Sequence, residues 1–248
     1  MLINIEWDKK MFSVDLNKAL DISIPLRSGE KNPNAFGIQH PQFDPFKFEN
    51  IILSVAQGGS VNCENLLINA HGNGTHTECV GHISKERITI NQCLTTFFSM
   101  AQLISVEAEN NIITKKVVEK FLNESVESLV IRTLPNDRNK LTKKYSGNNP
   151  TYLEAELCEW LREKNIKHLL IDLPSVDAEE DGGELAAHHA FWNYPTQPRM
   201  NATITEMIFV DDKIKDGMYL LNIQIASIES DASPSKPVLY ELKFNNLF

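Results

Sequence analysis

Long hydrophobic runs are absent from this sequence of 248 residues, and none approaches the roughly 18 apolar residues that a membrane-spanning helix needs. The segment from Met1 to Phe12 mixes acidic and basic residues, so it lacks the uninterrupted apolar core of a secretory signal. Cysteine is scarce, with four residues and no C-x-x-C spacing, which excludes a disulfide scaffold. We therefore expect a protein of the reducing cytoplasm.

Positive charge is also in short supply. The sequence has 24 lysines and arginines against 33 acidic residues, which gives a formal net charge of -9. A surface of that sign repels nucleic acid phosphates and anionic lipids, so neither is an expected partner. The motifs H-E-x-x-H, G-x-S-x-G and G-x-x-x-x-G-K-[ST] are missing, which excludes the commonest zincin, serine hydrolase and nucleotide-binding classes.

No internal repeat or linker divides the chain, so we expect one domain spanning residues 1–248. Two stretches predict helices, Lys115–Leu122 and Tyr152–Asn165, and Thr151 with Glu154 fits a capping box for the second. Short β-type runs dominate the rest, at residues 20–26, 51–55, 66–70, 103–106, 129–134, 168–173, 206–210, 219–226 and 238–244. The fold class is therefore mixed α and β.

Three of the seven histidines lie within twelve residues, at His71, His76 and His82. Glu78 lies two residues after His76, and His82 lies six residues after it, so an extended chain would point all three side chains to one side. Gly72 and Gly74 would let the chain bring His71 to the same place. The spacing thus predicts a cluster of imidazoles around one carboxylate.

Imidazole and carboxylate ligands suit a divalent cation of the zinc or manganese type. Further along the chain, His188, His189 and Glu206 offer the same donor types. A single histidine is most often a surface or hydrogen-bonded structural residue, but three with an interleaved acid fit a metal site as well as they fit a structural role. Cys79 would serve as a ligand or nucleophile in one alternative, although burial as a small apolar residue is the favoured interpretation.

A calcium loop is a weaker alternative. The run Asp177–Gly182 begins like one, but His188 occupies the twelfth position, where a bidentate glutamate is needed.

Several segments resemble the cyclase family of metal-dependent hydrolases, which includes bacterial kynurenine formamidase. The run Gly74-Thr-His-x-Glu-x-x-x-His82 is similar to the family signature H-x-G-T-H-x-D-x-P-x-H. Other segments match in the family's order: Leu20–Leu26, Ile131–Thr133, the D-x-P-S-V-D turn of Ile171–Asp177, and Leu185–His189. The resemblance implies a compact single-domain α+β fold of the swivelling β/β/α type. Such a fold has a β-barrel-like mixed sheet flanked by a few helices, and it usually forms a homodimer or a larger homo-oligomer.

The resemblance also implies roles for individual residues. His71 and His76 would bind a first metal, His188 a second, and Glu78 and Glu206 would bridge the two, so that one or two zinc or manganese ions are held per chain. His82 would donate and accept protons in catalysis. His188 is preferred over His189 because the family ligand directly follows the small residues after leucine.

The sequence departs from the family pattern in four places. His71 stands one residue early, Glu78 replaces the usual aspartate, and Val80 replaces the usual proline. The interval from His188 to Glu206 is also about six residues longer, and its segment Tyr194–Met200 is expected to pass near the metals and shape the pocket wall.

The expected function is hydrolysis of an amide, ester or lactone in a small molecule by a metal-activated water. The alternatives are kynurenine formamidase proper and a non-catalytic metal-containing binding protein. The formamidases place a tryptophan near the start of the chain to stack on their substrate. Here Phe36 is the only aromatic residue available in that stretch, and Trp7 lies too early to replace it.

Overall fold

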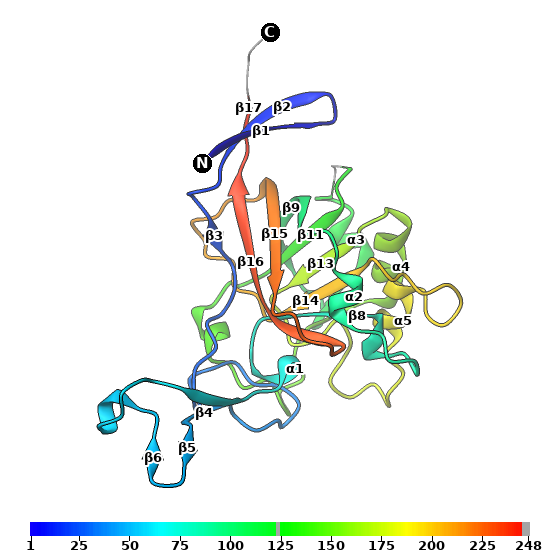
Figure 1. Ribbon diagram of the computed structural model, residues 1–248. Coiled ribbons are helices and arrows are strands. Elements are labelled where there is room, and N and C mark those ends of the chain that lie inside the picture. Colours follow the sequence, from blue (N-terminus) through cyan, green and yellow to red (C-terminus); the bar gives the residue numbers. More distant parts are fainter. Residues whose placement is uncertain (123–124, 245–248) are drawn as a thin grey trace.

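A closed barrel of seven strands forms the centre of the computed structural model, which describes residues 1–122 and 125–244 (Figure 1). Pairing between the first and last strands closes the barrel, and a short eighth strand, β3 (Leu20–Asp21), extends it beside β16. In spatial order the barrel strands are β15 (Gly217–Ile225), β9 (Phe98–Glu107), β11 (Ser128–Leu134), β13 (His168–Ile171), β14 (Thr203–Glu206), β8 (His76–Cys79) and β16 (Ala232–Glu241). The predicted mixed α+β class with a barrel-like core is confirmed.

Strands β9, β11, β13 and β14 run parallel to one another, and β11 and β13 are buried on both faces, which explains why these two appear in the sequence as largely apolar runs. In β11, Leu129 and Ile131 point to one face and pack in the core that includes Leu157 of a covering helix. Val130 points to the other face and joins a second core with Leu221. Side chains that alternate along one strand therefore fill the inside of the barrel on one face and pack against the covering helices on the other.

Helices are few and short. Among the described residues they are α1 (Ala70–Asn73), α2 (Ile90–Cys93), α3 (Lys115–Val118), α4 (Ala155–Glu163) and α5 (Ala186–Trp192), with single 3-10 turns at Val55–Gln57, Val80–His82 and Arg138–Leu141. The prediction that a capping box at Thr151 starts α4 is wrong. Glu154 is the N-cap because Tyr152 and Leu153 pair with residues 112–113 as strands β12 (Tyr152–Leu153) and β10 (Ile112–Ile113). Tertiary strand pairing here overrides the local capping signal.

Two groups of strands project from the barrel (Figure 1). One is the antiparallel set β1 (Leu2–Trp7), β2 (Lys10–Asp15) and β17 (Lys243–Phe244), in which Trp7 lies beside Phe12. The other, which we call the arm, covers residues 42–67 and contains β4 (Gln42–Pro45), β5 (Lys47–Phe48), β6 (Ile51–Ile52) and β7 (Glu64–Leu67). The described part of the chain contains no helix that is both long and apolar enough to cross a membrane.

The strand predicted at 206–210 is shifted. β14 runs from Thr203 to Glu206, and Met207 then turns the chain with a φ of 51°. Glu206 is therefore the last residue of its strand, at the end of the barrel where the predicted histidine and carboxylate ligands lie.

Candidate metal centre

His76 and Glu78 come from β8, which lies between β14 and β16 in the barrel. They alternate along one strand, so their side chains share a face, as the spacing predicted, and both are completely buried. His76 is the register partner of Glu206 on β14, and its Nε2 lies 3.3 Å from Glu206 Oε2. Its other ring nitrogen, Nδ1, lies 2.9 Å from the carbonyl oxygen of Gly74, which fixes the orientation of the ring.

His71 reaches the same place from the short helix α1. Asn69 caps this helix by accepting a hydrogen bond from Gly72 N at 3.1 Å. The ring then lies between two carboxylates, with Nδ1 3.1 Å from Glu78 Oε2 and Nε2 2.9 Å from Asp231 Oδ2. A helical turn thus accommodates the histidine that stands one residue early in the sequence.

The chain turns before His82, so the prediction that it stays extended as far as His82 is wrong. After Cys79 the chain forms the 3-10 turn Val80–His82, which a glycine allows because a Cβ at Gly81 would lie 1.9 Å from the backbone oxygen of Ile88. The His82 ring stacks on His71 at 4.3 Å between centroids. Its Nδ1 lies 3.2 Å from Asp231 Oδ2 and 3.8 Å from Glu78 Oε2.

His188 lies in the first turn of α5 and points its Nε2 to within 3.1 Å of Glu78 Oε1. Asp177 fixes the other side of the His188 ring. Its carboxylate accepts hydrogen bonds from the backbone nitrogens of Ala187 and His188 and lies 2.5 Å from His188 Nδ1. His189 instead places its Nδ1 3.0 Å from the carbonyl oxygen of Tyr194. Of the two adjacent histidines, the structure brings His188 to the cluster.

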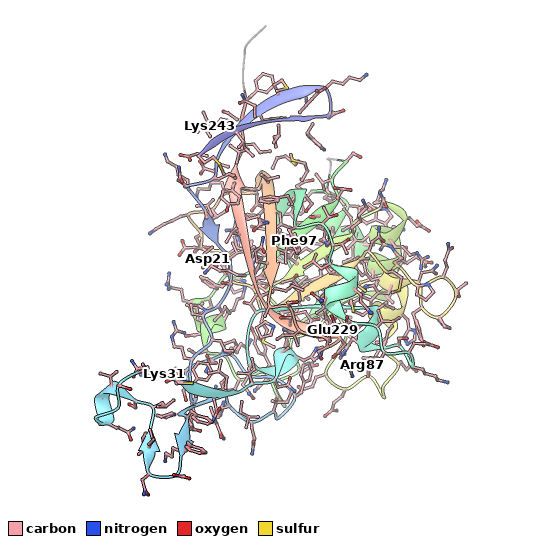
Figure 2. The ribbon with its side chains drawn as sticks, in the orientation of Figure 1. Asp21, Lys31, Arg87, Phe97, Glu229 and Lys243 are labelled. Atoms are coloured by element: carbon pink, nitrogen blue, oxygen red, sulfur yellow. The ribbon has the colours of Figure 1, made fainter. Side chains whose placement is uncertain are left out.

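Sequence reasoning missed Asp231, which contacts both His71 and His82. It comes from the connection between β15 and β16, 149 residues after His82, in a segment without a recognisable metal motif. This connection is anchored beside the segment that follows His82: Arg87 donates to the Glu229 carbonyl, and Thr89 donates to the Glu229 carboxylate. Figure 2 shows Arg87 and Glu229 next to each other.

The electrostatics of this cluster fit a bound cation. Burial disfavours ionisation of Glu78, but the facing rings of His82, His188 and His71 outweigh it and hold its pKa well below the usual range. Burial likewise opposes protonation of the histidines, yet Asp231 and Glu78 raise the pKa of His71 to about 10, and Asp177 and Glu78 raise that of His188 to about 10. The carboxylates therefore draw positive charge into a buried site.

Buried polar atoms without hydrogen bonds also indicate a bound cation. His76 Nε2 and Glu78 Oε2 are buried without a hydrogen bond in the described part of the chain, although each faces a group of the cluster. Buried polar atoms of this kind are costly unless a ligand or ion satisfies them. Ligand atoms of His71, His76 and Glu78, and separately of Glu78, His82 and His188, lie within 4.8 Å of one another. The donor set suits zinc or manganese.

A pocket of about 380 Å³ opens onto the cluster. Phe36 lines it together with His71, His82, His188 and Glu206. None of its lining residues comes from Tyr194–Met200, so the prediction that this segment shapes the pocket wall is wrong. The segment contacts α5 instead, where Arg199 lies over the ring of Phe191 at 5.1 Å and donates to the backbone carbonyls of Phe191 and Ile166.

The Cyclase family model matches residues 14–178, which include His71, His76, Glu78, His82 and Asp177. Kynurenine formamidase of Bacillus thuringiensis (strain Al Hakam) is 31% identical over 222 residues, with 89% of this chain and 96% of that protein covered. Kynurenine formamidase of Bacillus anthracis is 29% identical over 225 residues, covering 90% and 97%.

Solved structures share the fold. A potential metal-dependent hydrolase with cyclase activity matches with a TM-score of 0.65 at 16% identity, covering 90% of this chain and 98% of that one. An isatin hydrolase bound to the product analogue thioisatinate matches with a TM-score of 0.64 at 15% identity, covering 91% and 93%.

Proposed function

Because this chain belongs to the Cyclase family, we propose that it is a metal-dependent hydrolase that cleaves an amide, ester or lactone bond in a small molecule. One observation carries the proposal. The buried Glu78 carboxylate faces His71, His82 and His188 at the base of a pocket large enough for a small substrate. A structural metal site would be closed by protein groups, whereas this cluster opens to the pocket.

The proposed ligands are His71, His76, Glu78, His188 and Glu206, which would hold one or two zinc or manganese ions. When bound, the metal supplies Lewis acidity that polarises a carbonyl and makes water a nucleophile near neutral pH. Asp177 fixes the ring of His188 through Nδ1, and Gly74 fixes that of His76, so the opposite nitrogen of each ring faces the carboxylates.

His82 is the proposed general base and acid. Its Nδ1 lies against Asp231, which leaves Nε2 without a hydrogen-bond partner in the described part of the chain. A carboxylate on one side of an imidazole fixes the tautomer and supports the positive charge that the ring gains with a proton. Nε2 of His82 therefore takes the proton of the attacking water and returns it to the leaving group, and Asp231 orients the ring.

A panel of small amides, esters and lactones tests the proposal, assayed after chelation and again with added zinc or manganese. We expect hydrolysis of at least one class that depends on restored metal. Protein that binds metal and gains thermal stability from it, yet turns over no member of the panel, would favour the binding-protein alternative.

Kynurenine formamidase activity is the second candidate, because the relatives of that name cover nearly the whole chain. We expect this activity to be weak. Phe36 is the only aromatic residue in the stretch 28–36, and Trp7 packs beside Phe12 in a sheet outside the barrel. A misplacement of the reacting carbonyl by about 1 Å can cost 10²-fold in rate.

The measurement is kcat/KM for N-formylkynurenine with the metal that best supports the panel. A value within the ordinary enzyme range of about 10⁴–10⁸ M⁻¹s⁻¹ would contradict the expectation and identify the protein as a formamidase.

The finer assignments extend the same proposal. We propose a cytoplasmic enzyme that forms a homodimer or a larger homo-oligomer. Phe48, Ile51 and Leu66 of the arm are each more than half exposed, which supports association because a second copy would cover them.

A further inference from the structure

Two carboxylates line the pocket beyond the proposed metal ligands. Glu179 and Asp181 belong to the segment between β13 and α5, and both reach the pocket that opens onto the cluster. No lysine or arginine lines this pocket in the described ranges 1–122 and 125–244. The part of the wall that Glu179 and Asp181 form is therefore negative.

Backbone groups hold these carboxylates in place. Both oxygens of Glu179 accept from Gly147 N at 2.9 Å, and the Asp181 oxygens accept from Gly183 N at 2.8 Å and Leu185 N at 2.7 Å. Neither side chain forms an ion pair within the described residues. Their negative charge is fixed beside the pocket and is not neutralised by a neighbouring cation.

Phe36 presents an aromatic surface in the same pocket and is 45% exposed. Its backbone has a φ of 59°, a conformation that a bulky side chain rarely adopts, so the surrounding turn must impose it. Hydrogen bonds from Ala35 N to Gly72 O at 3.1 Å and from Gly37 N to Ser146 Oγ at 2.8 Å hold that turn on both sides. The backbone that carries the ring is thus held at the pocket before any substrate binds.

An aromatic face beside fixed carboxylates, without a lysine or arginine in the lining, forms an environment that binds organic cations. We propose that this pocket selects substrates whose non-reacting end carries an organic ammonium group, and that it disfavours anionic ones. The proposal rests on the hydrolase function proposed above, because it names the substrate class of the same site. The ammonium end would lie between Phe36 and the two carboxylates, with the scissile carbonyl toward His82.

Three phenyl acetates of similar shape test the charge preference, with para substituents of trimethylammoniomethyl, neopentyl and sulfonatomethyl. The substituents differ in charge but resemble one another in size, and the sulfonate is a poor metal ligand. We expect kcat/KM for the cationic ester to exceed that for the anionic ester by roughly tenfold or more, with the neutral ester between them. The difference should shrink as salt is added, because both carboxylates are partly exposed.

Charge-neutralising variants identify the residues responsible. Glu179→Gln and Asp181→Asn should each reduce the ratio of cationic to anionic kcat/KM, and kcat/KM for the neutral ester, measured on the same preparation, corrects for any general loss of activity. Glu180→Gln is the matched control, because Glu180 carries the same charge next to both residues but is exposed and does not line the pocket. An equal change in the control would mean that the net charge of the protein, not the pocket, sets the ratio.

The outcomes separate this proposal from the hydrolase function. Metal-dependent hydrolysis of the esters with no cationic preference, or with an anionic one, would overturn charge selection and leave the hydrolase intact. If chelation changes the hydrolysis of none of the three esters, the hydrolase proposal fails for these esters. Calorimetric titration with benzyltrimethylammonium and benzylsulfonate then decides charge selection. Tighter binding of the cation that weakens in Asp181→Asn would support it, and equal binding would overturn it.

Discussion

Replacing His76 with alanine should remove most of the bound metal and most of the thermal stabilisation that added metal gives. His76 is completely buried, and Gly74 fixes its Nδ1, so its Nε2 can only face the cluster with Glu206. A metal present at 100 times its dissociation constant stabilises a protein by about 2.7 kcal/mol, and the variant should lose nearly all of that gain. Elemental analysis and thermal unfolding with titrated zinc or manganese measure both effects.

His189→Ala is the matched control for this experiment. His189 follows His188 directly but contacts Tyr194 outside the cluster, so its removal should leave the metal content near the wild-type level. Wild-type metal content in His76→Ala would show that His76 does not bind the metal.

His82→Ala should behave differently, retaining its metal while losing activity by about 10²–10⁴-fold, the usual contribution of a general acid–base group. His82 Nδ1 lies closer to Asp231, at 3.2 Å, than to Glu78, at 3.8 Å, which fits a ring held at the edge of the ligand cluster. The measurement is kcat on the best panel substrate together with metal content of the same preparation.

His71, His82 and Asp231 also lie close enough together to hold an ion. Loss of metal from His82→Ala would therefore place His82 among the ligands and require another group to move the proton.

Much of the candidate metal centre could be predicted where neighbours in sequence are also neighbours in space. His76 and Glu78 share a face because a strand alternates its side chains, and this rule needs no tertiary information. The apolar runs that became β11 and β13 were recognisable for the same local reason, since strands buried on both faces are continuously hydrophobic. His188 was chosen over His189 from the family resemblance, and the fold brings it to Glu78.

Contacts between distant segments could not be read in this way. Asp231 meets His82 only because β16 pairs with both β15 and β8, which closes the barrel and carries the connection before β16 to the cluster. The start of α4 was missed because pairing of Tyr152 and Leu153 with a distant strand overcame a local capping signal. Tyr194–Met200 lies between two proposed ligands in sequence, yet none of its residues lines the pocket, and Arg199 bonds to Phe191 of α5 instead.

The sequence by itself determined the donor types, the alternation that pairs His76 with Glu78, and the mixed α+β class, because these depend on composition and on periodicity within single elements. The tertiary structure decided which carboxylates face the histidines, how His82 turns into the site, and that Glu179, Asp181 and Phe36 line one pocket. Those relations depend on barrel closure and on loops packed against one another. The contacts of Asp231 with His82 and of His188 with Glu78 join residues more than a hundred positions apart, and no local pattern encodes such contacts.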